Sequence, residues 1–327
     1  MFKLLTIGDN NIDIYRQSGI AYPGGNCSNV AAYAALNGYD SAYIGVVGND
    51  DMGTIMQRGL ESAGVDISHM ITKPGSSSVA CISVEDGDRL FSDYDRSIID
   101  NNPIQFDNDD LDFIKGFDLI HSSIYSEFAE GEFSRLASLG IPIVYDFSVE
   151  WHESYNERSD EEYLNELRPK SSDFLQRTCA KIDYAFLSCS HISEQESLEI
   201  IKQCVHWGCK TAVGTRRLNG AYAFDGHEVY HQNAYKTDIV DTLGAGDSFL
   251  TRFILTYFEG IQILEHCNHL FPTCKYEHED IMDYYIKLMQ SALSQAALFA
   301  SFSCQTEGAF GFGEKVIRPV DGNWKLT

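Results

Sequence analysis

Apolar runs of four to six residues alternate along most of the chain with stretches in which apolar residues recur every three or four positions. Short apolar runs are typical of buried strands, and a spacing of three or four is that of a helix with one buried face. Strands that alternate with helices predict an α/β fold, with a doubly wound, mainly parallel sheet and helices on both faces. The strands are expected at residues 3–8, 42–47, 118–121, 141–146, 183–188 and 210–214, and the helices at 28–36, 52–63 and 193–207.

Two segments depart from this alternation. Residues 77–98 alternate apolar and polar positions around the turn Asp86-Gly87, which predicts a β-hairpin. An acidic, histidine-bearing stretch at about 260–285 interrupts two helical segments, and we interpret it as a surface insertion. No long stretch rich in Pro, Gly and Ser marks a boundary, so we expect a single α/β domain over residues 1–327.

Composition narrows the class of protein. With 327 residues, 44% of them hydrophobic, the chain can bury a substantial core. A net charge of −24, with only 24 Lys and Arg, argues against a nucleic-acid surface but not against a nucleotide, which backbone N–H groups and Mg²⁺ can hold. We expect a cytoplasmic protein with no membrane partner, because no run of about 18 apolar residues and no signal peptide is present. Nine cysteines without a CxxC pair indicate reduced thiols.

The most informative local string is DTLGAGDSF at residues 241–249, which leads into an apolar helix through Phe258. Glycines on both sides of an alanine allow successive N–H groups to point outward at the start of a helix, where the dipole favours an anion. Such a pocket can hold a phosphoryl group, and Asp247 at its mouth can accept a proton from a hydroxyl. For an isolated GxGD, however, a helix N-cap and a simple turn would be the favoured explanation.

Short polar residues form a second cluster near the N-terminus. They follow the first predicted strand, where open α/β sheets bind ligands, and Asn and Asp can form paired hydrogen bonds with sugar hydroxyls. Ordinary turn chemistry would explain the same residue types. The cluster consists of Asp9, Asn11, Asp13, Gly24, Gly25, Asn26 and Asn29.

Taken together, the two strings resemble the two signatures of the ribokinase family, also called the phosphofructokinase B family. The resemblance implies a ribokinase-like fold with a small β lid from about residues 10–23 and 77–98, and ATP and Mg²⁺ as cofactors. It implies Asp247 as catalytic base, with the backbone of Gly244, Ala245 and Gly246 as the anion hole. The residues that it assigns to the acceptor sugar are Asn11, Asp13, Gly24, Gly25, Asn26 and Asn29.

The nucleotide side matches the family less closely. Thr215 and Gly220 fit the family's T-x-G-x-x-G turn beside ATP, but Arg217 replaces its middle glycine. Ser188 stands where many members have an asparagine beside the phosphates, and Glu194 could reach a metal only through water. The resemblance also implies that Asp241, Thr242 and Gly308 border the nucleotide.

The acceptor is narrowed by the residue after the glycine pair. Asn26 stands where ribokinase, and members that accept phosphorylated sugars, commonly have lysine, so an unphosphorylated acceptor is expected. The segments TIGDNNIDIY, YPGGNCSNVAAY, DRLFSDYD and DFSVEW are similar to members that phosphorylate fructoselysine. The resemblance therefore implies transfer from MgATP to the 6-hydroxyl of fructoselysine or a related fructosamine.

Several alternatives remain open. The acceptor could be another unphosphorylated sugar or a nucleoside, such as ribose, fructose or an adenosine-like compound, because Tyr15, Tyr22 and Phe91 could line a base pocket. A non-catalytic sugar-binding relative is a third possibility. The lid of this family often pairs with a second subunit, so a homodimer is expected.

Other mechanisms are disfavoured by their motifs. The chain has no GxxxxGK[ST] and no GxGxxG after the first strand, which argues against a P-loop and a dinucleotide fold. The spacing of His266, Cys267, His269, Cys274 and His278 matches no common zinc pattern.

Overall fold

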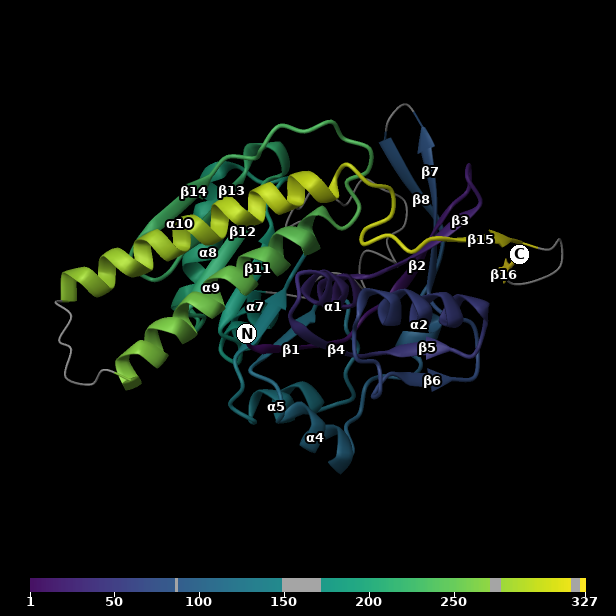
Figure 1. Cartoon of the computed structure of the whole chain (residues 1–327), viewed down its shortest axis with the longest axis horizontal. Coiled ribbons are helices and arrows are strands. Elements are labelled where there is room, and N and C mark those ends of the chain that lie inside the picture. The colour runs from purple at the N-terminus through teal and green to yellow at the C-terminus, as the bar shows by residue number, and fades with distance from the viewer. Residues whose placement is uncertain (86–87, 149–171, 271–277, 319–323) are drawn as a thin grey trace. The chain divides into compact units, whose positions relative to one another are not determined.

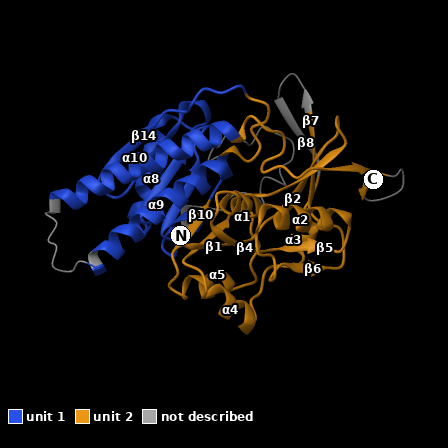
Figure 2. Cartoon of the chain, in the orientation of Figure 1, with its two compact units in different colours: residues 1, 147–238, 246–302 blue, residues 2–146, 239–245, 303–327 orange. Residues whose placement is uncertain are grey.

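The computed structural model describes residues 1–85, 88–148, 172–270, 278–318 and 324–327 (Figure 1). These residues cluster into two compact units (Figure 2). Unit 1 comprises residues 1, 147–238 and 246–302, and unit 2 comprises 2–146, 239–245 and 303–327. The single domain that we expected remains a prediction.

A parallel sheet forms the centre of unit 2. Its strands run in the order β10-β9-β1-β4, with Leu5 of β1 opposite both Ala42 and Ile120. Leu5, like its neighbours Leu4 and Ile7, is fully buried, as the apolar run predicted. Helix α1 (Asn26–Leu36) packs on β1, β4 and β9. The strands are β1 (Lys3–Ile7), β4 (Asp40–Ile44), β9 (Leu119–Ser123) and β10 (Ile143–Asp146).

The predicted lid segments belong to a second sheet of unit 2. Hairpins β2–β3 and β7–β8 are antiparallel, and β2 pairs in parallel with β7, which joins residues 10–23 to residues 77–98. The order is β16-β15-β3-β2-β7-β8, and helix α2 packs on β2 and β3. The elements are β2 (Asn11–Tyr15), β3 (Ile20–Gly24), β7 (Val79–Glu85), β8 (Asp88–Asp95), β15 (Glu314–Ile317), β16 (Lys325–Leu326) and α2 (Asp51–Ala63).

Short elements complete unit 2. Strands β5 and β6 form a separate parallel pair. Two short helices, α3 and α4, lie between β8 and β9, and a third, α5, lies between β9 and β10. Their bounds are β5 (Val46–Gly48), β6 (Ile71–Lys73), α3 (Ser97–Asp100), α4 (Asn108–Ile114) and α5 (Glu132–Ala137).

Unit 1 contains a mixed sheet. Strands β11 (Tyr184–Ser188) and β12 (Thr211–Thr215) are parallel and lie where the sequence predicted them. The hairpin of β13 (Ala221–Phe224) and β14 (Val229–Gln232) follows as an antiparallel extension that our sequence analysis missed. Other elements of unit 1 are α7 (Ser172–Cys179), α8 (Glu194–His206) and the 3-10 turn η2 (Arg217–Asn219).

Two long helices correct our interpretation of residues 260–285. Helix α9 spans Ala245–Leu270 and α10 spans His278–Ser303, so most of the segment that we expected to interrupt two helices belongs to them (Figure 1). Glycine inside α9 allows a close approach: a Cβ at Gly260 would lie 2.3 Å from the side chain of Leu288, and the hydroxyl of Tyr284 donates to the Gly260 carbonyl at 2.7 Å. No helix in the described residues is long and apolar enough to span a membrane.

Candidate active site

A network of buried polar side chains lies at the carboxyl ends of β1, β9 and β10 in unit 2. Asn26 is its centre: its Nδ2 donates to Asp146 at 2.7 Å, and its backbone N–H donates to Asp9 at 2.7 Å. Ser123 donates to the second oxygen of Asp9 at 2.6 Å, and Nε2 of His121 lies 2.8 Å from Oδ1 of Asn26. All five residues are at most 7% exposed. Asn26, which we predicted to bind the sugar, is therefore held firmly by the protein itself.

The protonation of His121 follows from this network. Burial lowers the pKa of His121 to about 3, so the ring is neutral at physiological pH. The Asn26 amide oxygen only accepts hydrogen bonds, so the proton of the neutral ring is assigned to Nε2. His121 therefore fixes which way the Asn26 amide points.

Asp13 and the glycine pair fit together through the β2–β3 register, in which Asn11 lies opposite Gly24. Asp13 is 4% exposed and accepts a hydrogen bond from Nδ2 of Asn11 at 2.7 Å. A Cβ at Gly24 would lie 2.1 Å from the Asp13 carboxylate. Gly25 has φ +103°, and a Cβ there would lie 2.5 Å from Cα of Asn10. Backbone packing and a positive φ thus require glycine at residue 25, and a side chain at residue 24 would displace the Asp13 carboxylate.

Asn29 completes the predicted acceptor group. It lies in the first turns of α1, is 3% exposed, and its N–H donates to the Gly25 carbonyl at 2.9 Å. Unit 2 therefore brings together all the residues that the sequence assigned to the acceptor, namely Asn11, Asp13, Gly24, Gly25, Asn26 and Asn29. The sequence analysis gave no role to His121, Ser123 or Asp146, which come from distant strands.

Asp241, the first residue of DTLGAGD, anchors this segment within unit 2. It is 2% exposed, and its carboxylate accepts hydrogen bonds from the N–H groups of Leu243 at 2.8 Å and Gly308 at 3.0 Å. The hydroxyl of Tyr15 donates to the same carboxylate. The backbone N–H of Asp241 donates to the Cys304 carbonyl at 3.1 Å. Asp241 and Gly308, predicted on the nucleotide side, are thus bonded to each other and shape the turn.

The glycines on either side of Ala245 have different environments. Gly244 has φ +73°, and a Cβ there would lie 2.8 Å from the Ala309 side chain and 2.9 Å from the Tyr33 hydroxyl. Gly246 is exposed, and an added Cβ would meet no atom of the described residues within 4 Å. Packing therefore explains why residue 244 is glycine, but it does not explain the glycine at residue 246.

Asp247 lies inside a helix and not at its cap. Helix α9 begins at Ala245, preceded by a turn in which the Ala245 N–H donates to the Thr242 carbonyl at 3.2 Å. Asp247 is therefore in the first turn, half-buried, and the N-cap explanation of its presence is excluded. The first N–H groups of a helix lack partners within it and attract anions. A carboxylate and an anion-binding helix start are thus adjacent in the chain.

The predicted nucleotide-side residues of unit 1 gather at the end of β12. Thr215 lies opposite Ser188 in the register, and its hydroxyl donates to the Leu187 carbonyl at 3.4 Å. Gly220 has φ +81°, and a Cβ there would lie 2.0 Å from the Gln232 carbonyl oxygen. Arg217 has φ +50°, so the position keeps a backbone conformation that favours glycine although its side chain is large.

Glu194 is the first residue of α8 and is exposed. Its side chain is 60% exposed and lies 3.9 Å from the guanidinium of Arg216. The described residues contain no group of three or more His, Cys, Asp or Glu arranged to hold a metal. Cys274 and the side chain of His278 lie outside that described part.

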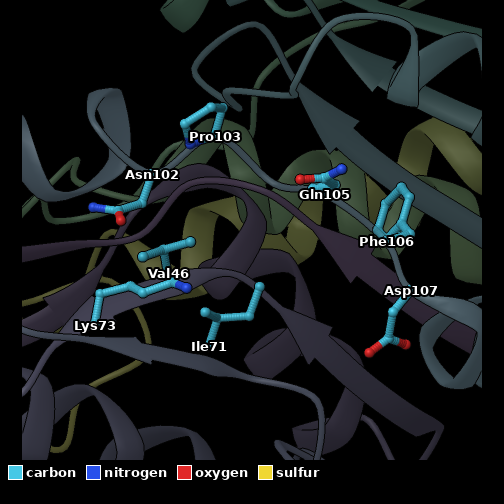
Figure 3. A pocket seen from close by; sticks show the side chains of 8 residues that line it. All are labelled: Val46, Ile71, Lys73, Asn102, Pro103, Gln105, Phe106 and Asp107. Carbon is cyan, nitrogen blue, oxygen red and sulfur yellow. The ribbon is translucent and has the colours of Figure 1, made fainter.

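A separate pocket of unit 2, with a volume of about 370 Å³, lies between β5, β6 and the segment before α4 (Figure 3). It includes no residue that the sequence predicted for catalysis or binding, so we assign no substrate to it. Its lining residues are Val46, Ile71, Lys73, Asn102, Pro103, Gln105, Phe106 and Asp107.

Comparison with known proteins defines the class. The model of the pfkB family of carbohydrate kinases matches residues 3–268, and the chain belongs to this family. It is therefore a sugar kinase of the pfkB and ribokinase type, as the two signatures predicted.

Two bacterial relatives cover most of the chain. Fructosamine kinase FrlD of Bacillus subtilis is 34% identical over 95% of this chain and 94% of its own. Fructoselysine 6-kinase of Escherichia coli is 33% identical over 80% of this chain and 92% of its own.

Solved structures confirm the predicted ribokinase-like fold. Arabidopsis thaliana ribokinase, complexed with ribose and ATP, matches with a TM-score of 0.67 at 18% identity over 94% of both chains. An E. coli putative ribokinase II, in complex with ATP and Mg²⁺, matches with a TM-score of 0.66 at 21% identity over 95% of both chains.

Proposed function

We propose that this sugar kinase transfers the γ-phosphoryl group of ATP to the 6-hydroxyl of fructoselysine or a closely related fructosamine. The observation that carries the proposal is the pair of relatives named for these substrates, which are 34% and 33% identical to the chain over 95% and 80% of its length. ATP as donor is supported by the ATP complexes among the structural neighbours.

The charge of the acceptor network supports an amine-bearing sugar. The carboxylates of Asp9, Asp13 and Asp146, all in unit 2, are each at most 7% exposed. A phosphorylated acceptor would need cations to offset its charge, whereas the cationic nitrogen of a fructosamine is attracted to carboxylates. Asn26, at the position of the family's lysine, is consistent with this preference.

In the mechanism that we propose, Asp247 accepts the proton of the acceptor hydroxyl as that hydroxyl attacks the γ-phosphorus, while the bond from the γ-phosphorus to the β,γ-bridging oxygen breaks and ADP leaves with the bond's electrons. The amides of Gly244, Ala245 and Gly246, together with the start of α9, stabilise the charge on the transferring group. The bare surface of Gly246 leaves room for a phosphoryl group at van der Waals distance. Thr215, Gly220 and Thr242 border the nucleotide.

We propose that Mg²⁺ has few direct protein ligands in this enzyme. In kinase sites this ion is usually held by few carboxylates, by water and by the phosphates themselves. The exposed side chain of Glu194 is suited to hold it through water. When bound, Mg²⁺ would neutralise phosphate charge.

A nucleoside acceptor is less well supported. Tyr15, one of the aromatic residues that could line a base pocket, is 4% exposed and donates to Asp241. The hydroxyl of Tyr22 donates to Glu307 at 3.0 Å. The side chain of Phe91 lies outside the described part of the chain.

We also propose that the lid sheet mediates a homodimer. Strand β8 is an edge of that sheet, and an edge strand offers unpaired backbone groups to a second copy. This proposal rests on the family resemblance and does not affect the assignment of the acceptor.

A panel of acceptors tests the proposed function. ATP consumption should be measured with fructoselysine, fructose, ribose and adenosine, and the phosphorylated position of the product should be determined by NMR. We expect kcat/KM for fructoselysine to exceed that for fructose by at least about tenfold, with phosphate on the 6-oxygen. Equal or better turnover of fructose, ribose or adenosine would remove the fructosamine assignment, and no turnover of any acceptor would favour a non-catalytic relative.

A further inference from the structure

Tyr15 and Asp241 are bonded to each other across 226 positions of the chain, and both belong to unit 2. Tyr15 ends strand β2 and is 4% exposed, and Asp241 is 2% exposed. A carboxylate buried this deeply is stable only when donors surround it. The Tyr15 hydroxyl is one of these donors, beside the N–H groups of Leu243 and Gly308.

Tyr15 lies on the strand that also supplies a proposed sugar ligand. Asp13 and Tyr15 are two positions apart in β2, and alternate residues of a strand point to the same face. The face that presents Asp13 therefore also holds Asp241, from which the chain continues through Gly244 to the start of α9.

A second aromatic residue reinforces this connection. The ring of Tyr22 packs edge-on against Tyr15 at 5.4 Å between centroids, and its hydroxyl donates to Glu307 at 3.0 Å. Burial and the Glu307 carboxylate raise the pKa of Tyr22 to about 12, so the phenol keeps its proton. A Cβ at Gly308 would lie 2.3 Å from the Tyr22 ring, so the turn packs directly on hairpin β2–β3.

From these contacts we infer that Tyr15 is a positioning residue for phosphoryl transfer. Its hydrogen bond to Asp241 fixes the segment 241–245 relative to the strand that carries Asp13. The distance between the proposed phosphoryl-binding turn and the strand β2, which carries the proposed sugar ligand, is then fixed. The inference rests on the proposed roles of Asp13 and of Gly244 to Asp247, and it adds a residue that contacts neither substrate.

The test is Tyr15→Phe, which keeps the ring and removes the hydroxyl. We expect kcat to fall by at least about tenfold, because small misplacements of reacting groups are costly, while KM for the acceptor changes by less than about twofold. Tyr230→Phe is the matched control: the hydroxyl of Tyr230 donates to the Asp225 carboxylate at 2.9 Å in the β13–β14 hairpin of unit 1. Its kcat should stay within about twofold of wild type.

The outcomes separate positioning from simple stability. Each variant is assayed at a temperature at which circular dichroism finds it folded. A Tyr15→Phe enzyme with wild-type kcat, or one in which only KM for the acceptor rises, would overturn the inference. Asp241→Asn provides a second variant of nearly unchanged shape, and its kcat should fall as well.

The double variant tests whether Tyr15 acts through Asp241. If it does, Tyr15→Phe with Asp241→Asn should be no slower than Asp241→Asn alone, whereas multiplied losses would contradict the route through Asp241. All assays use the acceptor that the wild-type enzyme turns over fastest. A failure of the fructosamine assignment therefore leaves this test intact.

Discussion

The predicted acceptor residues of unit 2 and the predicted nucleotide residues of unit 1 are built in different ways. Asp13, Asn26 and Asn29 are 3 to 6% exposed, and Asn26 is hydrogen-bonded to residues of two different strands, Asp146 of β10 and His121 of β9. Gly246 is exposed, and the Glu194 side chain is 60% exposed. The predicted nucleotide residues of unit 1 are distinguished by their backbone conformation, whereas the predicted acceptor residues of unit 2 are distinguished by buried side chains.

This difference predicts that the two sides respond differently to substitution. Arg217 replaces a glycine on the nucleotide side yet keeps a positive φ of +50°, so the turn survives the substitution. A change in the acceptor network would instead leave a buried polar group without its partner, at a cost of about 1–3 kcal/mol. Acceptor specificity should therefore be the more sensitive property.

The largest effect is expected at Asp247. Asp247→Asn removes the proposed base while keeping its size, and turnover should fall by about 100-fold to 10,000-fold. Binding of ATP should remain nearly intact, because backbone amides hold the phosphates in our proposal. Steady-state kinetics and calorimetric titration with a non-hydrolysable ATP analogue measure the two effects.

Asp109 supplies a matched control for this variant. It is an exposed carboxylate in the first turn of α4, so Asp109→Asn loses the same favourable interaction with a helix start. Both variants should lose similar, small amounts of stability, but Asp109→Asn should keep wild-type kcat. A mutant at Asp247 that retains more than about a tenth of the wild-type kcat contradicts its assignment as base.

The two glycines beside Ala245 should separate stability from activity. Gly244→Ala places a Cβ 2.8 Å from Ala309 at φ +73° and should lower the melting temperature. The Cβ of Gly246→Ala would meet no other atom of the described residues within 4 Å, and alanine is a better helix former in the first turn of α9, so the fold should be unharmed. Its Cβ would enter the space proposed for the phosphoryl group, and kcat/KM for ATP should fall by about 10-fold to 100-fold.

Thermal unfolding and kinetics on both variants decide this point. Gly246→Ala is the informative variant, and Gly244→Ala is its control for damage to the turn. If Gly246→Ala were both stable and fully active, the amides around residue 246 would have no part in holding the phosphates.

The sequence predicted the repeating elements well, since apolar periodicity depends only on neighbouring residues. The strand at residues 3–8, helix 28–36 with its stop at Asn37-Gly38, and the hairpin at 77–98 all occur within a few residues of their predicted bounds. The β13–β14 hairpin was missed although Asp225-Gly226 marks its turn, because its strands are only four residues long.

Hydrogen bonds between residues far apart in the chain could not be predicted from the sequence. The motifs indicated that Asp241 and Asn26 matter, but not that Tyr15 donates to Asp241 or that His121 and Asp146 hold the Asn26 amide. Most of the segment at about 260–285, which we interpreted as a surface insertion, is likewise helical, and the close approach of Gly260 to Leu288 joins positions that no local pattern relates. Such pairings depend on the sheet order, which no local pattern specifies.

The smallest expected effect is the contribution of the neutral His121 to the pH dependence of stability. Its sign follows from the linkage between proton binding and folding. The pKa of His121 is about 3 in the folded protein and about 6.5 when the chain is unfolded. Below pH 6.5 the unfolded chain therefore binds the extra proton and the folded protein does not. The stabilisation that comes from keeping His121 neutral is fully present above pH 6.5 and is lost progressively as the pH falls towards 3.

Urea unfolding at pH 7.5 and pH 5.5 can isolate this contribution from those of the other histidines. Between pH 7.5 and pH 5.5 the free energy of unfolding of the wild type should fall by about 1.4 kcal/mol more than that of His121→Gln. The glutamine amide of this variant can still donate to Asn26 but does not titrate. His191, exposed on the nucleotide side, is the matched control, and His191→Gln should keep the wild-type difference. Equal pH dependence in wild type and His121→Gln would mean that the acceptor network admits a charged histidine. The contrast between a buried, preset acceptor side and an open nucleotide side would then lose its electrostatic basis.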